Sequence, residues 1–94
     1  MTRTAATTIA TAHASKYLQQ LCKHFSHKIE TGFTPDAGWI RFEFGKADLG
    51  AAADRLTITA EAASAADLDR LQGVLASHLE RFAFREDLTI EWDT

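Results

Sequence analysis

A short basic stretch, CKHFSH at residues 22–27, holds side chains that could do chemistry: one thiol, one amine and two imidazoles. On a helix, His24 and His27 lie on one flank, where two imidazoles at this spacing can bind one divalent ion. Cys22 lies on the apolar side of the same helix, so it is best explained as a small buried hydrophobe. A metal site would still lack a third and a fourth ligand. A solvated face rich in His and Lys, including Lys23, is therefore the favoured interpretation.

Further along the chain, the stretch HLERFAFRED carries one histidine and two arginines near the end of a second predicted helix. His78 falls at the edge of the apolar stripe, so we expect it to be half-buried and to bond a backbone carbonyl, with ligand binding as the alternative. If the two helices are neighbours, His78 and His24 can face each other across the seam between them. Arg81 and Arg85 could clamp a carboxylate or phosphate, but ion pairs with the adjacent acidic residues are favoured.

A third group lies on a predicted strand face that no helix is expected to cover. Trp39 and Arg41 alternate there with the apolar residues of the opposite face. An exposed Trp usually marks a contact with another molecule. A ligand shelf would explain it, but the interface of a homodimer is favoured because symmetric dimers are the commonest soluble oligomers.

Two amphipathic helices must position these groups. Apolar residues at spacings of three and four predict one helix within residues 13–29, capped by Ser15. A second helix is predicted to follow Ser64, with Asp67 in its first turn and an apolar stripe that ends at Phe82. Alternating apolar residues predict strands at 6–11, 29–33, 39–44, 47–51, 55–61 and 88–92.

The resulting order is β-α-β-β-β-β-α-β. Short hairpin links favour antiparallel pairing, and each helix has a single apolar stripe to bury. The predicted fold is therefore α+β: a two-layer sandwich in which a curved antiparallel sheet carries both helices on one face, within a single domain of residues 1–94. This order resembles the TATA-binding-protein-like and helix-grip folds, and such a likeness alone carries no function.

The composition is that of an ordinary globular domain, with 46% hydrophobic and 24% charged residues. One cysteine permits no internal disulfide, and neither a signal peptide nor a membrane span is apparent, so a cytoplasmic location away from membranes is expected. Residues 1–29 carry a charge of +4 and no acid, whereas residues 30–94 carry −7. Four dispersed cations are too few for nucleic-acid binding. The basic segment could face an anionic ligand or lipid, but acidic strand ends of the same chain or of a second copy are favoured as its partner.

Two stretches, ASKYLQQLCKHFSHKIE and SHLERFAFREDLTIEWD, resemble the bacterial domain-of-unknown-function family 2218, and the likeness extends across essentially the whole chain. The family has no established activity. Some of its members are linked to siderophore-interacting flavin reductases, so the resemblance implies an accessory role in iron or siderophore handling, with a siderophore-like ligand and a flavin reductase as partners. The positions that match the family's motifs are Cys22, Lys23, His24, His27, Lys28, His78, Glu80, Arg81, Phe82 and Arg85.

Three functions stay open and are ranked in this order. The first is a non-enzymatic module that binds a small anionic or iron-linked ligand, without a cofactor, through Lys23, His24, His27, His78, Arg81 and Arg85. The second is an interaction protein that forms a homodimer or docks a partner through Trp39 and Arg41. The third is an enzyme or metal protein that uses His24 and His27. The sequence has no P-loop, GxGxxG, GxSxG or HExxH motif. The absence of these motifs argues against an enzyme but does not exclude one.

Overall fold

Five strands form one antiparallel sheet in the computed structural model, which describes residues 2–83 and 85–93 of the chain. The strands are β1 (Arg3–Ala10), β2 (Glu30–Phe33), β3 (Ala37–Phe42), β4 (Gly45–Ala51) and β5 (Arg55–Ala62). Their order in the sheet is β1-β5-β4-β3-β2. Strands β2 to β5 are therefore a continuous meander, and β1 joins it beside β5.

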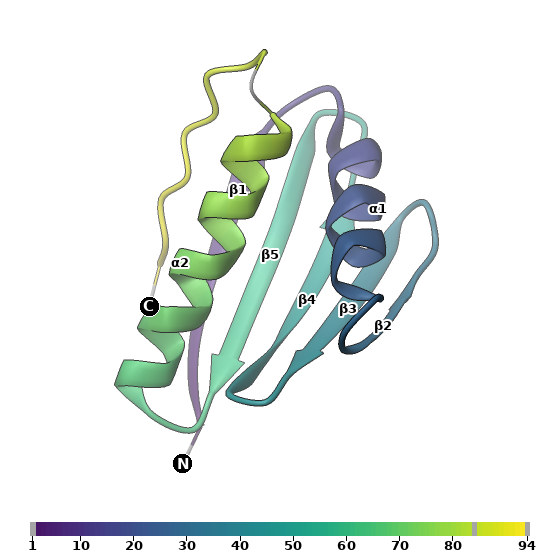
Figure 1. Cartoon of the computed structure of the whole chain (residues 1–94). Coiled ribbons are helices and arrows are strands. Elements are labelled where there is room, and N and C mark those ends of the chain that lie inside the picture. Colours follow the sequence, from purple (N-terminus) through teal and green to yellow (C-terminus); the bar gives the residue numbers. More distant parts are fainter. Residues whose placement is uncertain (1, 84, 94) are drawn as a thin grey trace.

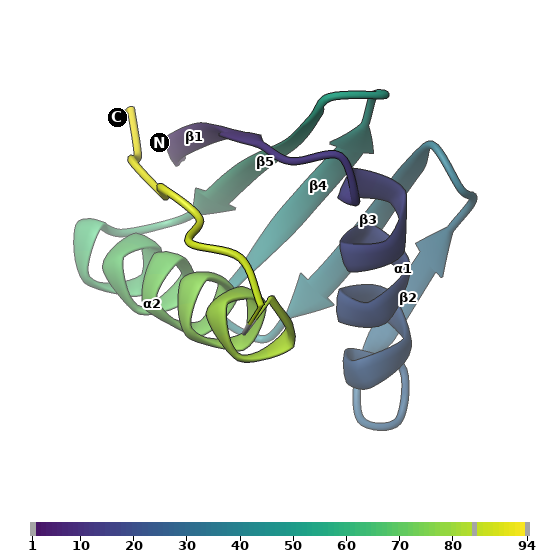
Figure 2. The same ribbon diagram turned by 90° about the horizontal axis from the view of Figure 1, so that it is seen from above.

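Both helices of the described chain, α1 (Ala14–Phe25) and α2 (Ala65–Phe82), lie on the same face of this sheet (Figure 1). Seen from above, α1 and α2 form one layer and the strands form the other, while the opposite face of the sheet carries no helix (Figure 2). The predicted α+β sandwich is confirmed, and the sheet is open because β1 and β2 do not pair with each other. No helix in the described ranges is long and apolar enough to cross a membrane.

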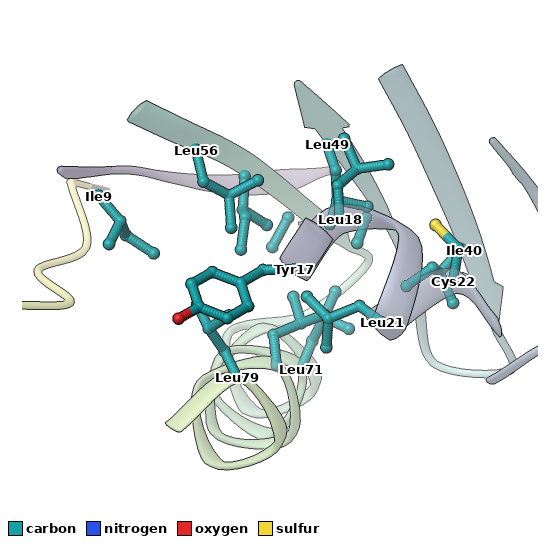
Figure 3. Packing of buried hydrophobic residues seen from close by; sticks show 14 of the residues in the cluster. Ile9, Tyr17, Leu18, Leu21, Cys22, Ile40, Leu49, Leu56, Leu71 and Leu79 are labelled. Atoms are coloured by element: carbon teal, nitrogen blue, oxygen red, sulfur yellow. The ribbon is translucent and has the colours of Figure 1, made fainter. Parts of the chain in front are cut away.

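The core lies between the two layers (Figure 3). Strand alternation points one face of the sheet toward the helices, and the helices contribute leucines at spacings of three and four. The fully buried large side chains are Ile9, Leu18, Leu21, Cys22, Ile40, Leu56, Ile58, Leu71, Leu75 and Leu79. This packing fixes how α1 and α2 face each other, and thereby positions the candidate site.

The two helices begin differently. Ser64 caps α2 as predicted, because its hydroxyl oxygen accepts a hydrogen bond from the backbone N–H of Asp67 at 3.1 Å. The predicted cap at Ser15 is wrong: α1 already begins at Ala14, and the backbone N–H of Tyr17 donates to the carbonyl of His13 at 3.1 Å. Ser15 is therefore inside the first turn, and its hydroxyl donates to the carbonyl of Pro35 at 2.6 Å instead.

The strand predicted at residues 88–92 does not form. The segment after α2 returns along that helix toward β1 (Figure 2) and pairs with it only through a single antiparallel bridge, between Ala6 and Asp93. The two backbone hydrogen bonds of this bridge measure 2.9 and 2.8 Å. Leu88, Ile90 and Trp92 pack, half-buried, against the core. The alternation of apolar residues in this segment therefore reflects packing against the core. Such packing does not require a full ladder of backbone hydrogen bonds.

Candidate functional site

The histidines of the two helices meet at the seam between α1 and α2. His24 lies in the last turn of α1 and His78 in the C-terminal half of α2, and their ring centroids are 5.0 Å apart. Phenylalanines complete the cluster: the ring of Phe82 lies 5.7 Å from that of His24, and the ring of Phe25 lies 4.9 Å from that of His78. Core packing of the leucine stripes brings these rings together, since each lies beside a buried residue of its own helix.

One nitrogen of His78 is engaged within its own helix. Its Nδ1 lies 2.7 Å from the carbonyl oxygen of Val74, one turn earlier. Because a carbonyl can only accept, Nδ1 carries the hydrogen and donates it. This is the bond to a backbone carbonyl that was expected for a half-buried imidazole, and it leaves Nε2 as the nitrogen with a lone pair in the neutral ring.

His24 sits in a cationic environment. Its pKa is lowered, first by desolvation and then by repulsion from His78, His27, Arg81 and Lys28. Every charged group in this set is basic, so nothing among them favours the protonated ring. This environment therefore favours the neutral form of the His24 imidazole.

A cleft of about 570 Å³ opens beside these rings, between the start of α1 and the segment after α2. It is lined by His13, Lys16, Tyr17, Phe82, Arg85 and Glu86. Phe82 belongs to both places, since it lines the cleft and contacts the ring of His24. We call the cleft together with His24, His78 and Arg81 the basic seam.

The carboxylate of Glu86 in this cleft is already engaged by two hydroxyl groups. Tyr17 donates a hydrogen bond to Glu86 Oε2, and the hydroxyl of Thr11 donates to Oε1 at 3.0 Å. The bond from Tyr17 contributes most to lowering the pKa of Glu86, and together with the bond from Thr11 and the neighbouring basic side chains it outweighs desolvation. Burial, followed by the contact with Glu86, raises the pKa of Tyr17 to about 12.

Sequence reasoning missed this contact between Tyr17, Thr11 and Glu86. Tyr17 is one of the apolar residues whose spacing predicts the first helix, and it is buried. Glu86 is one of the acidic residues adjacent to Arg85, for which the sequence favours ion pairs. The hydroxyl groups lie 69 and 75 residues from Glu86 in the chain, so no local spacing could have revealed the partnership.

Other predicted site residues lie apart from the seam. α1 ends at Phe25, with the hydroxyl of Ser26 donating to the carbonyl of Lys23, so His27 lies in the following turn and does not share a helix flank with His24. Lys23 is exposed and does not line the cleft. Within residues 2–83 and 85–93, no group of three or more His, Cys, Asp or Glu side chains is placed to hold a metal ion.

Comparison with known proteins identifies the family. Residues 6–93 match the family model described as "Uncharacterized protein conserved in bacteria (DUF2218)". The chain belongs to this family. The resemblance found in the sequence is thereby confirmed, and the family's description names no activity.

A solved structure shares the fold. The NMR structure of PA4090 from Pseudomonas aeruginosa is 33% identical in sequence and superposes with a TM-score of 0.81, over 96% of this chain and 94% of that one. Among curated proteins, none matches the chain. The sheet and helices described above are therefore shared with an experimentally determined structure.

Three further residues singled out by the sequence, Cys22, Trp39 and Arg41, do not line the cleft. Burial raises the pKa of the Cys22 thiol to about 11, so this side chain is a protonated, buried hydrophobe and not a nucleophile. On the uncovered face of the sheet, Trp39 is half-buried, because its ring lies over Gly32 and under the guanidinium of Arg41, 5.5 Å from the ring centroid. Arg41 also pairs with Glu30 at 3.0 Å. Trp39 is thus partly covered by its own chain, and less exposed than the sequence suggested.

Proposed function

We propose that this protein is a non-enzymatic module that binds a small anion at the basic seam. The observation that carries this proposal is the arrangement of charge around the cleft. His13, Lys16 and Arg85 line it, while the acidic lining residue among those described, Glu86, accepts hydrogen bonds from Tyr17 and Thr11. An anion entering the cleft would meet basic side chains from both ends of the chain and an already engaged carboxylate.

The size and walls of the cleft indicate the class of ligand. A volume of about 570 Å³ is in the range of small-molecule sites. The lysine and the arginine suit carboxylate or phosphate oxygens, and the ring of Phe82 offers an apolar wall. Iron-chelating siderophores carry carboxylate, catecholate or hydroxamate oxygens, so the siderophore-related ligand implied by the family resemblance falls within this class.

Isothermal titration calorimetry of the full chain with citrate and with inorganic phosphate would test the proposal. We expect one site, and an affinity about 5-fold or more weaker in Lys16→Ala and in Arg85→Ala, since each loses a charge-assisted contact. Arg55→Ala is the matched control, because it removes one exposed positive charge that pairs with Asp54 outside the cleft. Equal weakening in the control, or no binding of either probe at millimolar concentration, would refute the proposal.

A ferric citrate arm of the same titration tests the iron-related version. Tighter binding of the ferric complex than of citrate, again weakened by Lys16→Ala, would support it. Equal affinity for both would leave a general anion site without a connection to iron.

The uncovered face of the sheet favours a second candidate function, a homodimer through Trp39 and Arg41. Neither α1 nor α2 covers this face (Figure 2), and a half-buried Trp lies on it. Sedimentation at rising concentration should then show a dimer that Trp39→Ala disrupts. A monomer at the highest concentration would exclude it.

A further inference from the structure

Two imidazoles from different helices face each other in the basic seam. The ring centroids of His24 and His78 are 5.0 Å apart, and the ring planes are inclined by 49°. His24 is exposed and His78 is half-buried, so the pair lies at the surface of the protein. Rings this close can each direct a nitrogen at one ion about 2.0–2.1 Å away, the usual metal–imidazole distance.

The state of both rings suits a metal ligand. His78 donates Nδ1–H to the carbonyl of Val74 at 2.7 Å, and such a bond is the usual device that fixes the tautomer and orientation of a metal-binding histidine. Its Nε2 is then the nitrogen available to an ion. No hydrogen bond engages the ring nitrogens of His24 within the described part of the chain, so either nitrogen can turn toward the same ion.

We propose that His24 and His78 together bind one divalent transition metal ion, such as Ni²⁺, Cu²⁺ or Zn²⁺, which keeps water or other small oxygen ligands at its remaining positions. Imidazole nitrogens favour ions of this class over Mg²⁺ and Ca²⁺. No three-residue ligand group exists among the described residues, so the protein supplies two ligands and the ion is exchangeable. The proposal does not depend on anion binding, since neither histidine lines the cleft.

The charge around the pair gives metal binding an unusual response to salt. Arg81 and Lys28 act on His24 and would repel a bare dication. Added salt screens that repulsion, because the Debye length falls from about 10 Å at 0.1 M to about 3 Å at 1 M. Metal affinity should therefore rise with an inert salt such as sodium perchlorate, while anion affinity at the cleft falls, so failure of one proposal can be told from failure of the other.

Titration of the untagged full chain with Ni²⁺ by calorimetry, and with Zn²⁺ by imidazole NMR, would test the site. We expect one ion per chain, ring resonances of both His24 and His78 that shift together, and an affinity more than about 10-fold weaker in His24→Ala and His78→Ala. His27→Ala is the matched control, because it removes the neighbouring imidazole outside the proposed pair. It should bind the ion as the unsubstituted protein does.

Three results would overturn the inference. One is the absence of binding at millimolar Ni²⁺. Another is undiminished affinity in His24→Ala, an exposed position where the substitution leaves the core intact. The third is binding that is lost in His27→Ala but kept in folded His78→Ala, which would assign the ion to the pair predicted from helical spacing. If His78→Ala does not fold, the NMR titration decides, since Zn²⁺ must perturb the His78 ring.

Discussion

The carboxylate of Glu86 links the C-terminal segment to two other parts of the chain. Its oxygens accept from Tyr17 on α1 and from Thr11, which follows β1. A carboxylate that accepts hydrogen bonds from two hydroxyl groups is favoured in its charged form, and the tyrosine that donates is favoured in its neutral form. Both shifts make the stability of the protein depend on pH.

Removing the Tyr17 hydroxyl should weaken the fold without opening the core. Tyr17→Phe keeps the buried ring and removes one hydrogen bond to a charged acceptor, which costs about 1–2 kcal/mol. Urea unfolding would measure the loss. Tyr17→Phe combined with Glu86→Gln should lose less than the sum of the two single substitutions, and full additivity would mean that the two groups do not interact.

The same contact predicts losses of stability at both ends of the pH range. The folded pKa of Glu86 lies below 4.5, so its contribution is present above that value and disappears as pH falls through the folded pKa. The folded pKa of Tyr17 is raised from 10.0 to about 12, so its contribution is present below pH 10 and is lost as pH rises toward 12. Chemical denaturation across pH should show both declines, and Tyr17→Phe should remove the alkaline one.

Two glycines allow a matched test of the packing. A Cβ at Gly38 would lie 2.9 Å from the sulfur of Cys22 and 3.1 Å from Leu18 Cδ2, so Gly38→Ala overpacks the seat of α1 on β3 and should cost about 1–3 kcal/mol. A Cβ at Gly73 on α2 meets nothing within 4 Å, so Gly73→Ala should gain about 0.5–1 kcal/mol from helix propensity. Thermal unfolding of both variants checks the opposite signs; a shift of the same sign in both would contradict this account.

At the scale of elements, the C-terminal segment depends on few bonds. Glu86 holds it to Tyr17 and Thr11 near its start, and the bridge between Ala6 and Asp93 holds it near its end. Half-buried apolar side chains lie between these two points. A segment with so few backbone hydrogen bonds should open locally before the sheet does.

Release of the anchor at Glu86 should loosen the far end of this segment. In Glu86→Ala, the amides of Ala6 and Asp93 should exchange with solvent faster, because their bonds to each other at 2.9 and 2.8 Å lose the support of the anchor. Hydrogen exchange followed by NMR would measure this. Asp87→Ala is the control, since it removes the neighbouring exposed carboxylate. Unchanged exchange at Ala6 would mean that the bridge forms independently of Glu86.

The same scale shows what a sequence can reveal. Periodicity located both helices and the five strands, and the capping role of Ser64, because these are local relationships within a few residues. Sequence patterns located the start of α1 wrongly. Ser15 is a favourable N-cap residue by type, yet the first turn of α1 already begins at Ala14, with a backbone hydrogen bond to the carbonyl of His13. The positions of His24 and His78 on their helices allowed a contact between them if the two helices were neighbours. The partners of Glu86, in contrast, depend on the tertiary fold alone.

At the scale of the whole molecule, the basic seam belongs to a protein that is acidic overall. The net charge is −3, although residues 1–29 alone carry +4. α1 carries two of these four charges, Lys16 and Lys23, and Lys16 lines the cleft together with Arg85. The molecule extends 35 × 27 × 20 Å. The positive electrostatic potential at the cleft is therefore local, and the acidic residues elsewhere in the protein oppose it at longer range.

This arrangement predicts a limited salt dependence for anion binding. Affinity for citrate should rise as salt is lowered from about 1 M to about 0.1 M, where the Debye length is about 10 Å and the cleft cations act alone. Below that it should level off, because at about 0.01 M the Debye length of about 30 Å spans the molecule and its acidic residues offset the gain. Calorimetry in a salt series checks this; an undiminished rise down to 0.01 M would contradict it.

The two edge strands of the sheet, β1 and β2, differ in how much of their outer backbone is available for pairing. This difference limits how two copies of the protein could pair through their sheets. At β1 the unpaired backbone is interrupted at Ala6, where Asp93 already occupies the hydrogen-bonding groups. β2 lies at the other border, and its outward backbone groups face no further strand among those described. Lengthening the sheet by strand addition would therefore meet less obstruction at β2 than at β1, and two copies joined through β2 would each present the obstructed edge outward. Such joining would favour a pair over a fibre.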